Sequence, residues 1–233
     1  MHRRQFNTTG LIGALSFMAY FHTAQAVSLA DLSGPEASAG LKLALEKGAV
    51  AAVGLLGAPD GFMGNDKVRI ALPGYLNEAG RWLKMMGQGQ KLDELVLGMN
   101  RAAESAMPLA KDMLVGAVKS MSVSDAKTIL TGGSTSATEY FNHKTREPLG
   151  QKFLPVITQA TAKVGLTAQY NAVASKALSL GLLKPQEATL ESYVTGKALD
   201  GLYLMIGEEE KKIRQDPVGT GSALLSKVFG ALR

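Results

Sequence analysis

The sequence has no cysteine among its 233 residues and only three histidines. The missing cysteines exclude disulfide scaffolds, thiolate nucleophiles, zinc ribbons and iron–sulfur clusters. Three histidines leave little material for a histidine-based metal site, so we expect neither a metal ion nor another cofactor. Beyond the amino-terminal segment, the longest apolar run is 49–58. A membrane-spanning helix needs about 18 apolar residues, so we expect no transmembrane segment in the mature chain.

Residues 1–26 have the organisation of a secretory signal peptide. Arg3 and Arg4 form a positive amino-terminal region, and residues 11–21 form a short apolar region. The small-residue pattern predicts a cleavage site formed by Ala24, Ala26 and Val27. The arginine pair also fits a twin-arginine signal, but the residues after it depart from the commoner continuation, so the Sec route stays open. We therefore expect a periplasmic protein that is cleaved after Ala26.

The charge balance argues against nucleic acid as a partner. The full chain has 25 lysines and arginines against 20 acidic residues. Cleavage would remove two arginines and no acid, which leaves 23 cations against 20 acids, a net charge of +3. These cations are scattered along the chain, whereas nucleic-acid binding requires a basic patch or stripe.

Apolar residues recur with the helical period almost everywhere after residue 27, which predicts a single all-α domain, a bundle of about eight helices, over 27–233. Prolines, glycines and capping residues place the expected helices at 35–56, 73–86, 92–117 with a kink from Pro108, 122–131, from 134, 148–164, 167–180, 186–195 and 197–214. The alternation at 67–72 is compatible with a short extended segment, but the sequence offers no second strand to pair with it. We expect residues 222–233 to form a C-terminal add-on helix, whose apolar face packs on its own domain or, as the alternative, on a partner or a membrane surface.

Several stretches of the sequence together carry a family resemblance. They are KVRIALP at 67–73, NRAAE at 100–104, DAKTILTG at 125–132, ATEYF at 137–141 and EEKKIR at 209–214. In this order they resemble the bacterial domain-of-unknown-function 4197 family of exported helical proteins. The resemblance implies export and a single domain, and it carries no assigned reaction, ligand or catalytic residue.

Polar residues within these stretches and close to them form a candidate cluster, whose role we expect to be functional or structural. Its members are Arg69, Asn100, Arg101, Glu104, Asp125, Thr138, Tyr140, Arg146, Glu209 and Arg214. Arg101 and Glu104 are spaced as an ordinary surface pair, as are Glu208 with Lys212 and Glu210 with Arg214.

Glu209 differs from the other acids because it falls on the apolar stripe of its helix, between Ile206 and Ile213. An unpaired buried carboxylate is too costly, so we expect Glu209 to be mostly buried beside an arginine. Arg69, Arg101 and Arg146 are the candidates.

Other polar segments have simpler interpretations. The loop 60–66 is rich in oxygen ligands but lacks the spacing of a calcium loop, so turn chemistry explains it. Ser136 and Glu139 have capping-box spacing. His143 is expected near a helix end in solvent, and the sequence lacks the Gly-x-Ser-x-Gly turn of a serine hydrolase.

These observations favour a binding or structural role in the cell envelope, with a hydrophobic ligand or an envelope protein as the partner. The alternative is a metal-independent hydrolase or transferase in which Glu104, Asp125, Tyr140 and Glu209 act as acids and bases in a helical cleft. A solvent-reachable pocket that holds two of those carboxylates would favour the enzyme.

The signal peptide gives a first testable prediction. Sequencing of the mature protein from its amino terminus should begin at Val27, because Ala24 and Ala26 position the cleavage. Replacing Arg3 and Arg4 together by lysine should block export if the twin-arginine route is used. A cytoplasmic protein that retains Met1 would contradict the predicted localisation, and unaffected export of the double variant would indicate the Sec route.

Overall fold

The computed structural model describes residues 34–76, 81, 84–85, 87, 89–165, 167–179, 181, 183 and 188–216. The expected signal peptide, with Ala24, Ala26 and Val27, lies outside the described residues. So does the expected add-on helix at 222–233.

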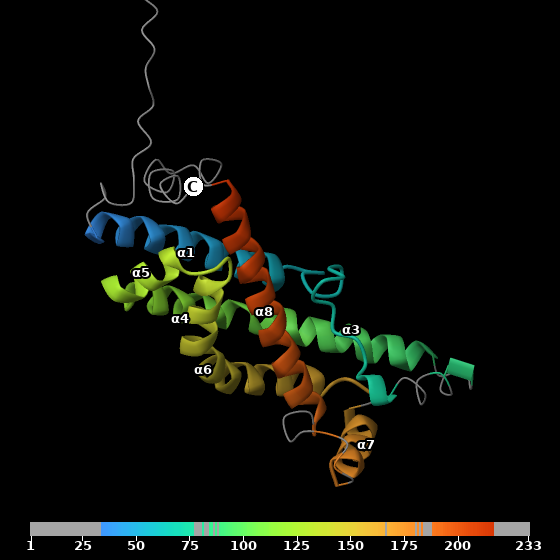
Figure 1. Cartoon of the computed structure of the whole chain (residues 1–233). Coiled ribbons are helices and arrows are strands. Elements are labelled where there is room, and N and C mark those ends of the chain that lie inside the picture. Colours follow the sequence, from blue (N-terminus) through green and yellow to red (C-terminus); the bar gives the residue numbers. More distant parts are fainter. Residues whose placement is uncertain are drawn as a thin grey trace, which may run out of the picture.

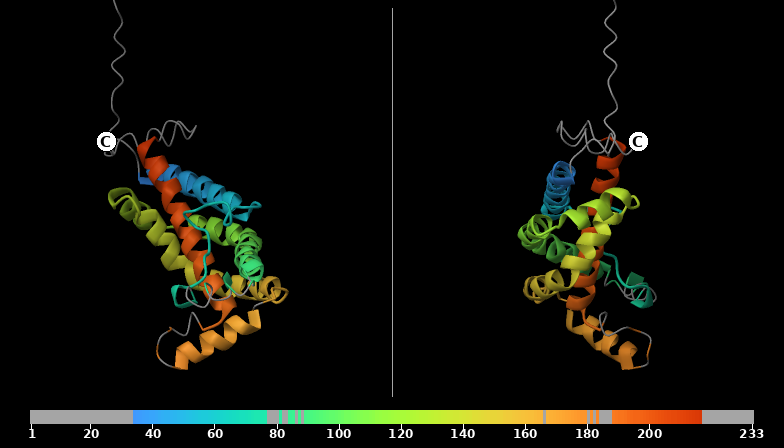
Figure 2. Two further views of the ribbon diagram at one scale, coloured as in Figure 1. Left: turned by 90° about the vertical axis from the view of Figure 1, so that its right-hand side faces the viewer. Right: turned by 60° about the vertical axis from the view of Figure 1, so that its left-hand side comes forward.

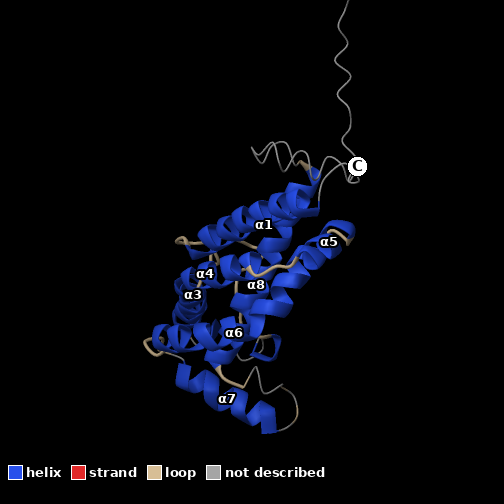
Figure 3. Cartoon of the chain, turned by 90° about the vertical axis from the view of Figure 1, so that its left-hand side faces the viewer, coloured by secondary structure: helices blue, strands red, loops and turns tan. Residues whose placement is uncertain are grey.

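Within the described residues all regular structure is helical and no strand occurs (Figure 3). This confirms the predicted all-α, single-domain fold. The elements are α1 (Gly34–Gly57), the 3-10 turn η2 (Gly74–Leu76), α3 (Gly89–Ala106), α4 (Pro108–Lys119), α5 (Val123–Thr131), α6 (Ser136–Thr161), α7 (Thr167–Ser179) and α8 (Leu190–Gln215). No helix in the described ranges combines the length and the apolar character needed to cross a membrane.

Helix α8 crosses the others and packs against α1, α3 and α6 (Figure 1). Helices α1 and α4 also pack on each other, and α6 packs on α3 and α4. Helix α7 lies at the end of the molecule away from the start of α1 and contacts α8 (Figure 2). The core between these layers holds the largest fully buried side chains, among them Leu41, Leu56, Phe62, Met99, Leu114, Phe141 and Phe153.

The long apolar stripe predicted at 92–117 is buried along most of its length, as expected for core. It does not form one continuous helix, because Pro108 begins α4 as its first residue. A proline at this position loses no hydrogen bond, whereas inside a helix it would. The break lies at Met107, three residues beyond the expected kink near Glu104.

Two predicted helix boundaries were wrong. Helix α6 continues through Pro148 and Pro155, and α8 continues through Gly196. Each helix places a long buried stripe against its neighbours, from Phe141 to Ile157 in α6. This burial outweighs the local cost of proline or glycine within a helix. Of the helix expected at 73–86, the structure describes only η2 and a few further residues.

Candidate functional site

The members of the predicted polar cluster do not meet at one place. Three buried polar side chains, on α3 and α8, instead hold separate segments of the chain together. These three are Asn100, Glu104 and Glu210.

Glu104 fastens the loop after α1. Its Oε1 accepts hydrogen bonds from the backbone N–H groups of Phe62 and Met63, at 3.1 and 3.2 Å. Its Oε2 accepts one from Arg101 at 2.7 Å, and Arg101 also donates to Asp60 at 2.7 Å. These two carboxylates raise the pKa of Arg101, Glu104 foremost. The predicted pair is therefore present, but its acid is buried and positions the loop.

Asn100 fastens the segment after this loop to α3. Its Oδ1 accepts from the N–H of Ile70 at 2.8 Å, and its Nδ2 donates to the carbonyl of Ile70 at 2.9 Å. The amide thus satisfies both backbone groups of a buried residue in a non-helical segment, as a neighbouring strand would.

Glu210 belongs to α8, but its carboxylate lies at the amino terminus of α6. Its carboxylate accepts from the N–H groups of Ala137 and Thr138, at 3.1 and 2.9 Å, and from the Thr138 hydroxyl at 2.8 Å. Arg214 donates to the same carboxylate through Nε and Nη2, and its Nη2 also donates to the carbonyl of Ile129. The first N–H groups of a helix lack partners in that helix, and an anion there is also favoured by the helix dipole.

Glu209 was predicted to be mostly buried beside an arginine; the burial is confirmed, but the partner was wrong. Its ion pair is with Lys212 at 2.6 Å, although only 15% of its side chain is exposed. The predicted pair of Glu210 with Arg214 is present, but it is buried and not a solvated surface pair. Glu208 pairs with Lys67 and Lys211 instead of Lys212.

The remaining candidate acid and base residues have local structural contacts. Asp125 caps α5 with Ser122, whose hydrogen bonds lower the pKa of Asp125. The Tyr140 hydroxyl donates to the carbonyl of Ala117, and burial raises its pKa. The capping box expected at Ser136 is absent, because the Ser136 hydroxyl donates to Ile129 and Gly133. Among the described residues, no group of three or more His, Cys, Asp or Glu could hold a metal ion.

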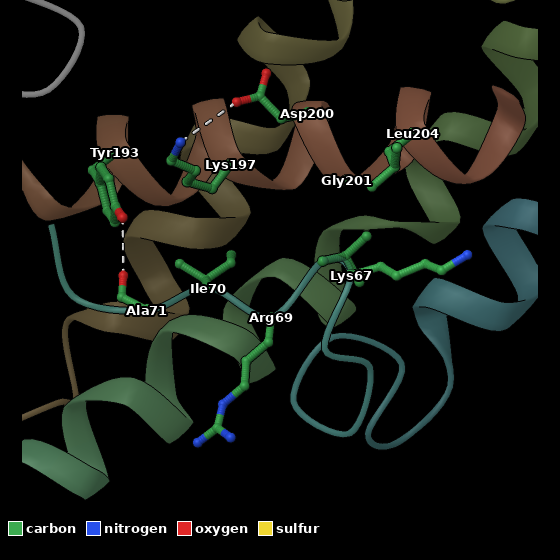
Figure 4. Close-up of a pocket in the computed structure, with 10 residues that line it drawn as sticks. Lys67, Arg69, Ile70, Ala71, Tyr193, Lys197, Asp200, Gly201 and Leu204 are labelled. Atoms are coloured by element: carbon green, nitrogen blue, oxygen red, sulfur yellow. Dashed lines mark hydrogen bonds and ion pairs between the residues drawn. The ribbon is translucent and has the colours of Figure 1, made fainter. Parts of the chain in front are cut away.

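A hollow of about 360 Å³ lies between the segment 67–71 and α8 (Figure 4). Three cations line it, but they do not converge. Arg69 extends away from α8, Lys67 is paired with Glu208, and Lys197 lies over the ring of Tyr193. The hollow therefore offers no single point at which charges gather.

A second and larger hollow, of about 520 Å³, lies between α6 and the first half of α8, and we call it the α6–α8 groove. Its volume is typical of small-molecule sites, which span roughly 300–1,000 Å³. Helix α6 contributes Asn142, His143, Arg146, Glu147, Gly150 and Leu154, and α8 contributes Ser192, Thr195, Gly196 and Leu199. His143 was expected near a helix end, yet it lies exposed in the first half of a 26-residue helix.

Thr195, in the wall of this groove, has a buried hydroxyl without a hydrogen-bond partner in the described structure. Other helical threonines donate to the carbonyl four residues earlier, namely Thr128, Thr131, Thr145, Thr158 and Thr161. An unsatisfied buried hydroxyl typically costs about 1–3 kcal/mol. Thr195 therefore differs from these threonines, because its hydroxyl makes no such hydrogen bond in the described structure.

Glycine on α8 leaves space in the groove. A Cβ atom built on Gly196 meets no atom within 4 Å, although glycine within a helix costs up to about 1 kcal/mol relative to alanine. Five residues further on, Gly201 is required by packing, since a Cβ atom there would lie 2.7 Å from the ring of Phe62. The space beside Gly196 belongs to the groove, where Gly196 is a lining residue.

One known protein family matches this chain over most of its length. The family described as a protein of unknown function, DUF4197, matches residues 31–230. The chain belongs to the DUF4197 family. No match was found among curated proteins or among solved structures. The DUF4197 match thus spans the loop held by Glu104, the α6–α8 groove and the carboxylate of Glu210.

Sequence reasoning found Arg146, which lines the groove, but missed its neighbours Thr195 and Gly196. A glycine after a threonine in a helical pattern is a weak signal of a helix end, which is how Gly196 was interpreted. The open space beside Gly196 exists only because α6 packs on α8, and these helices are some fifty residues apart in the sequence.

The two neighbouring glutamates provide a matched stability test. Glu210→Gln should destabilise the protein by about 3 kcal/mol. The amide has only one acceptor oxygen, so some of the N–H and hydroxyl donors at the α6 terminus lose their acceptor. The variant also removes the negative charge that pairs with Arg214. Glu209→Gln should cost less than about 1 kcal/mol, because Lys212 is exposed. Urea unfolding of both variants measures the difference, and equal losses would contradict the assignment of Glu210.

Proposed function

We propose that this chain is exported to the periplasm and there binds a small molecule in the α6–α8 groove, without itself performing a covalent reaction. The observation that carries the binding proposal is the α6–α8 groove itself, of about 520 Å³, which brings Arg146 and His143 together with the apolar Leu154 and Leu199. A ligand would pair with these polar side chains and cover the apolar surface of Leu154, which is 40% exposed.

The export part of the proposal is supported by the amino-terminal pattern of charged, apolar and small residues at 1–26. The hydrolase or transferase alternative draws no support from the residues first considered for it. Glu104, Asp125, Tyr140 and Glu209 do not meet at one place, although Asp125 acts electrostatically on Tyr140, and none of the four lines the groove.

Filling the groove tests the proposal. In Gly196→Leu the new Cβ meets no atom and the rest of the side chain extends into the groove, so the variant should fold about as stably as the wild type but lose its ligand. The matched control is Gly116→Leu on α4, where a Cβ also meets nothing within 4 Å but which lies outside the groove.

The measurement is mass spectrometry of small molecules released by denaturing protein purified from the periplasm. We expect one compound to accompany the wild type and Gly116→Leu in near-equal molar amounts and to be missing from Gly196→Leu. If Gly196→Leu carries the same compound, the groove is not the binding site.

A further inference from the structure

The charges at the groove indicate which kind of small molecule it accepts. Arg146 and Glu147 are consecutive residues of α6 with opposite charges, and both line the groove. An anionic ligand would gain from Arg146 and be repelled by Glu147, and a cationic ligand would experience the reverse. The chemistry of the two side chains decides between these cases.

Arg146 retains donors for a ligand. Its Nη2 donates to Asp200 at 2.6 Å, and its guanidinium lies 5.8 Å from the centre of the Tyr203 ring. The N–H groups on Nε and Nη1 make no hydrogen bond to any described residue. A guanidinium placed over an aromatic ring is pre-organised, and its planar set of donors matches a carboxylate.

The other polar groups of the groove agree with an anionic head group. His143 is exposed one turn before Arg146 and makes no hydrogen bond or ion pair within the described structure, so it can donate a second hydrogen bond. Glu147 is exposed and stays hydrated. A single exposed carboxylate offers a cation little net binding energy in water.

The floor of the groove is apolar. Leu154 and Leu199 line it from opposite helices, and Gly150 and Gly196 place no side chain in it. We propose that the α6–α8 groove binds an amphiphilic anion, with its carboxylate at Arg146 and its apolar chain along Leu154 and Leu199. This inference rests on the proposed function, because it specifies the ligand of the same groove.

Asp200 provides a sharp variant, because its carboxylate already occupies one nitrogen of Arg146. If the guanidinium binds the ligand's carboxylate, Asp200 competes with the ligand. Asp200→Asn should then strengthen binding, whereas a purely structural ion pair would give unchanged or weaker binding. Glu147→Gln should also strengthen binding, because it removes a repulsion.

The test is calorimetric titration of the mature protein with octanoate, octylammonium and octanol, which share one apolar chain. Octanoate should bind about tenfold more tightly than octylammonium, as expected for one charge-assisted hydrogen bond. Arg146→Gln should reduce octanoate affinity about tenfold. Lys152→Gln is the control, because it removes an exposed cation of the same helix outside the groove.

The other outcomes separate this inference from the proposed function. If all three probes bind equally and Gly196→Leu blocks them, the groove binds apolar molecules and the anion preference is wrong. A preference for octylammonium, or octanoate binding that survives in Gly196→Leu, also overturns the inference. If no probe binds but a compound still accompanies the purified wild type, only the ligand class is wrong, and if neither occurs, the proposed function fails too.

Discussion

The carboxylate of Glu210 at the amino terminus of α6 is the contact on which the arrangement of the long helices depends. It substitutes for a capping side chain, since Thr135 before the helix makes no capping hydrogen bond. Because Glu210 belongs to α8, the cap joins two helices that pack along their lengths. Arg214 extends the same contact to the end of α5 through the carbonyl of Ile129.

Glu104 repeats this solution at another place. Each acid accepts from two backbone N–H groups of a distant segment and from an arginine of its own helix. A buried carboxylate is tolerated only when charge and hydrogen bonds both compensate for its lost hydration. The conspicuous acids of the sequence therefore connect segments of the chain. The groove that we propose as the functional site is built from inconspicuous residues, chiefly a threonine and glycines.

The periodicity of the sequence was sufficient to predict the fold class, because long apolar stripes such as that of 92–117 indicate helices with one buried face. It could not place Pro148 or Gly196 inside helices, because tertiary packing of α6 on α8 outweighs their local preferences. It also could not choose between Glu209 and Glu210. Both follow Ile206 by three or four residues, so both fit the stripe, and only the position of the α6 terminus decides which is capped and buried. The groove was not predictable for the same reason, since its walls come from different helices.

The central claim is that the space between α6 and α8 is the binding site of this protein. Amide chemical shifts of the isotope-labelled mature protein, recorded during a titration with octanoate, test it most directly. The largest changes should fall on residues 142–154 and 192–199, on the two walls of the groove. Changes centred on the hollow beside 67–71, or spread evenly over the surface, would contradict the account.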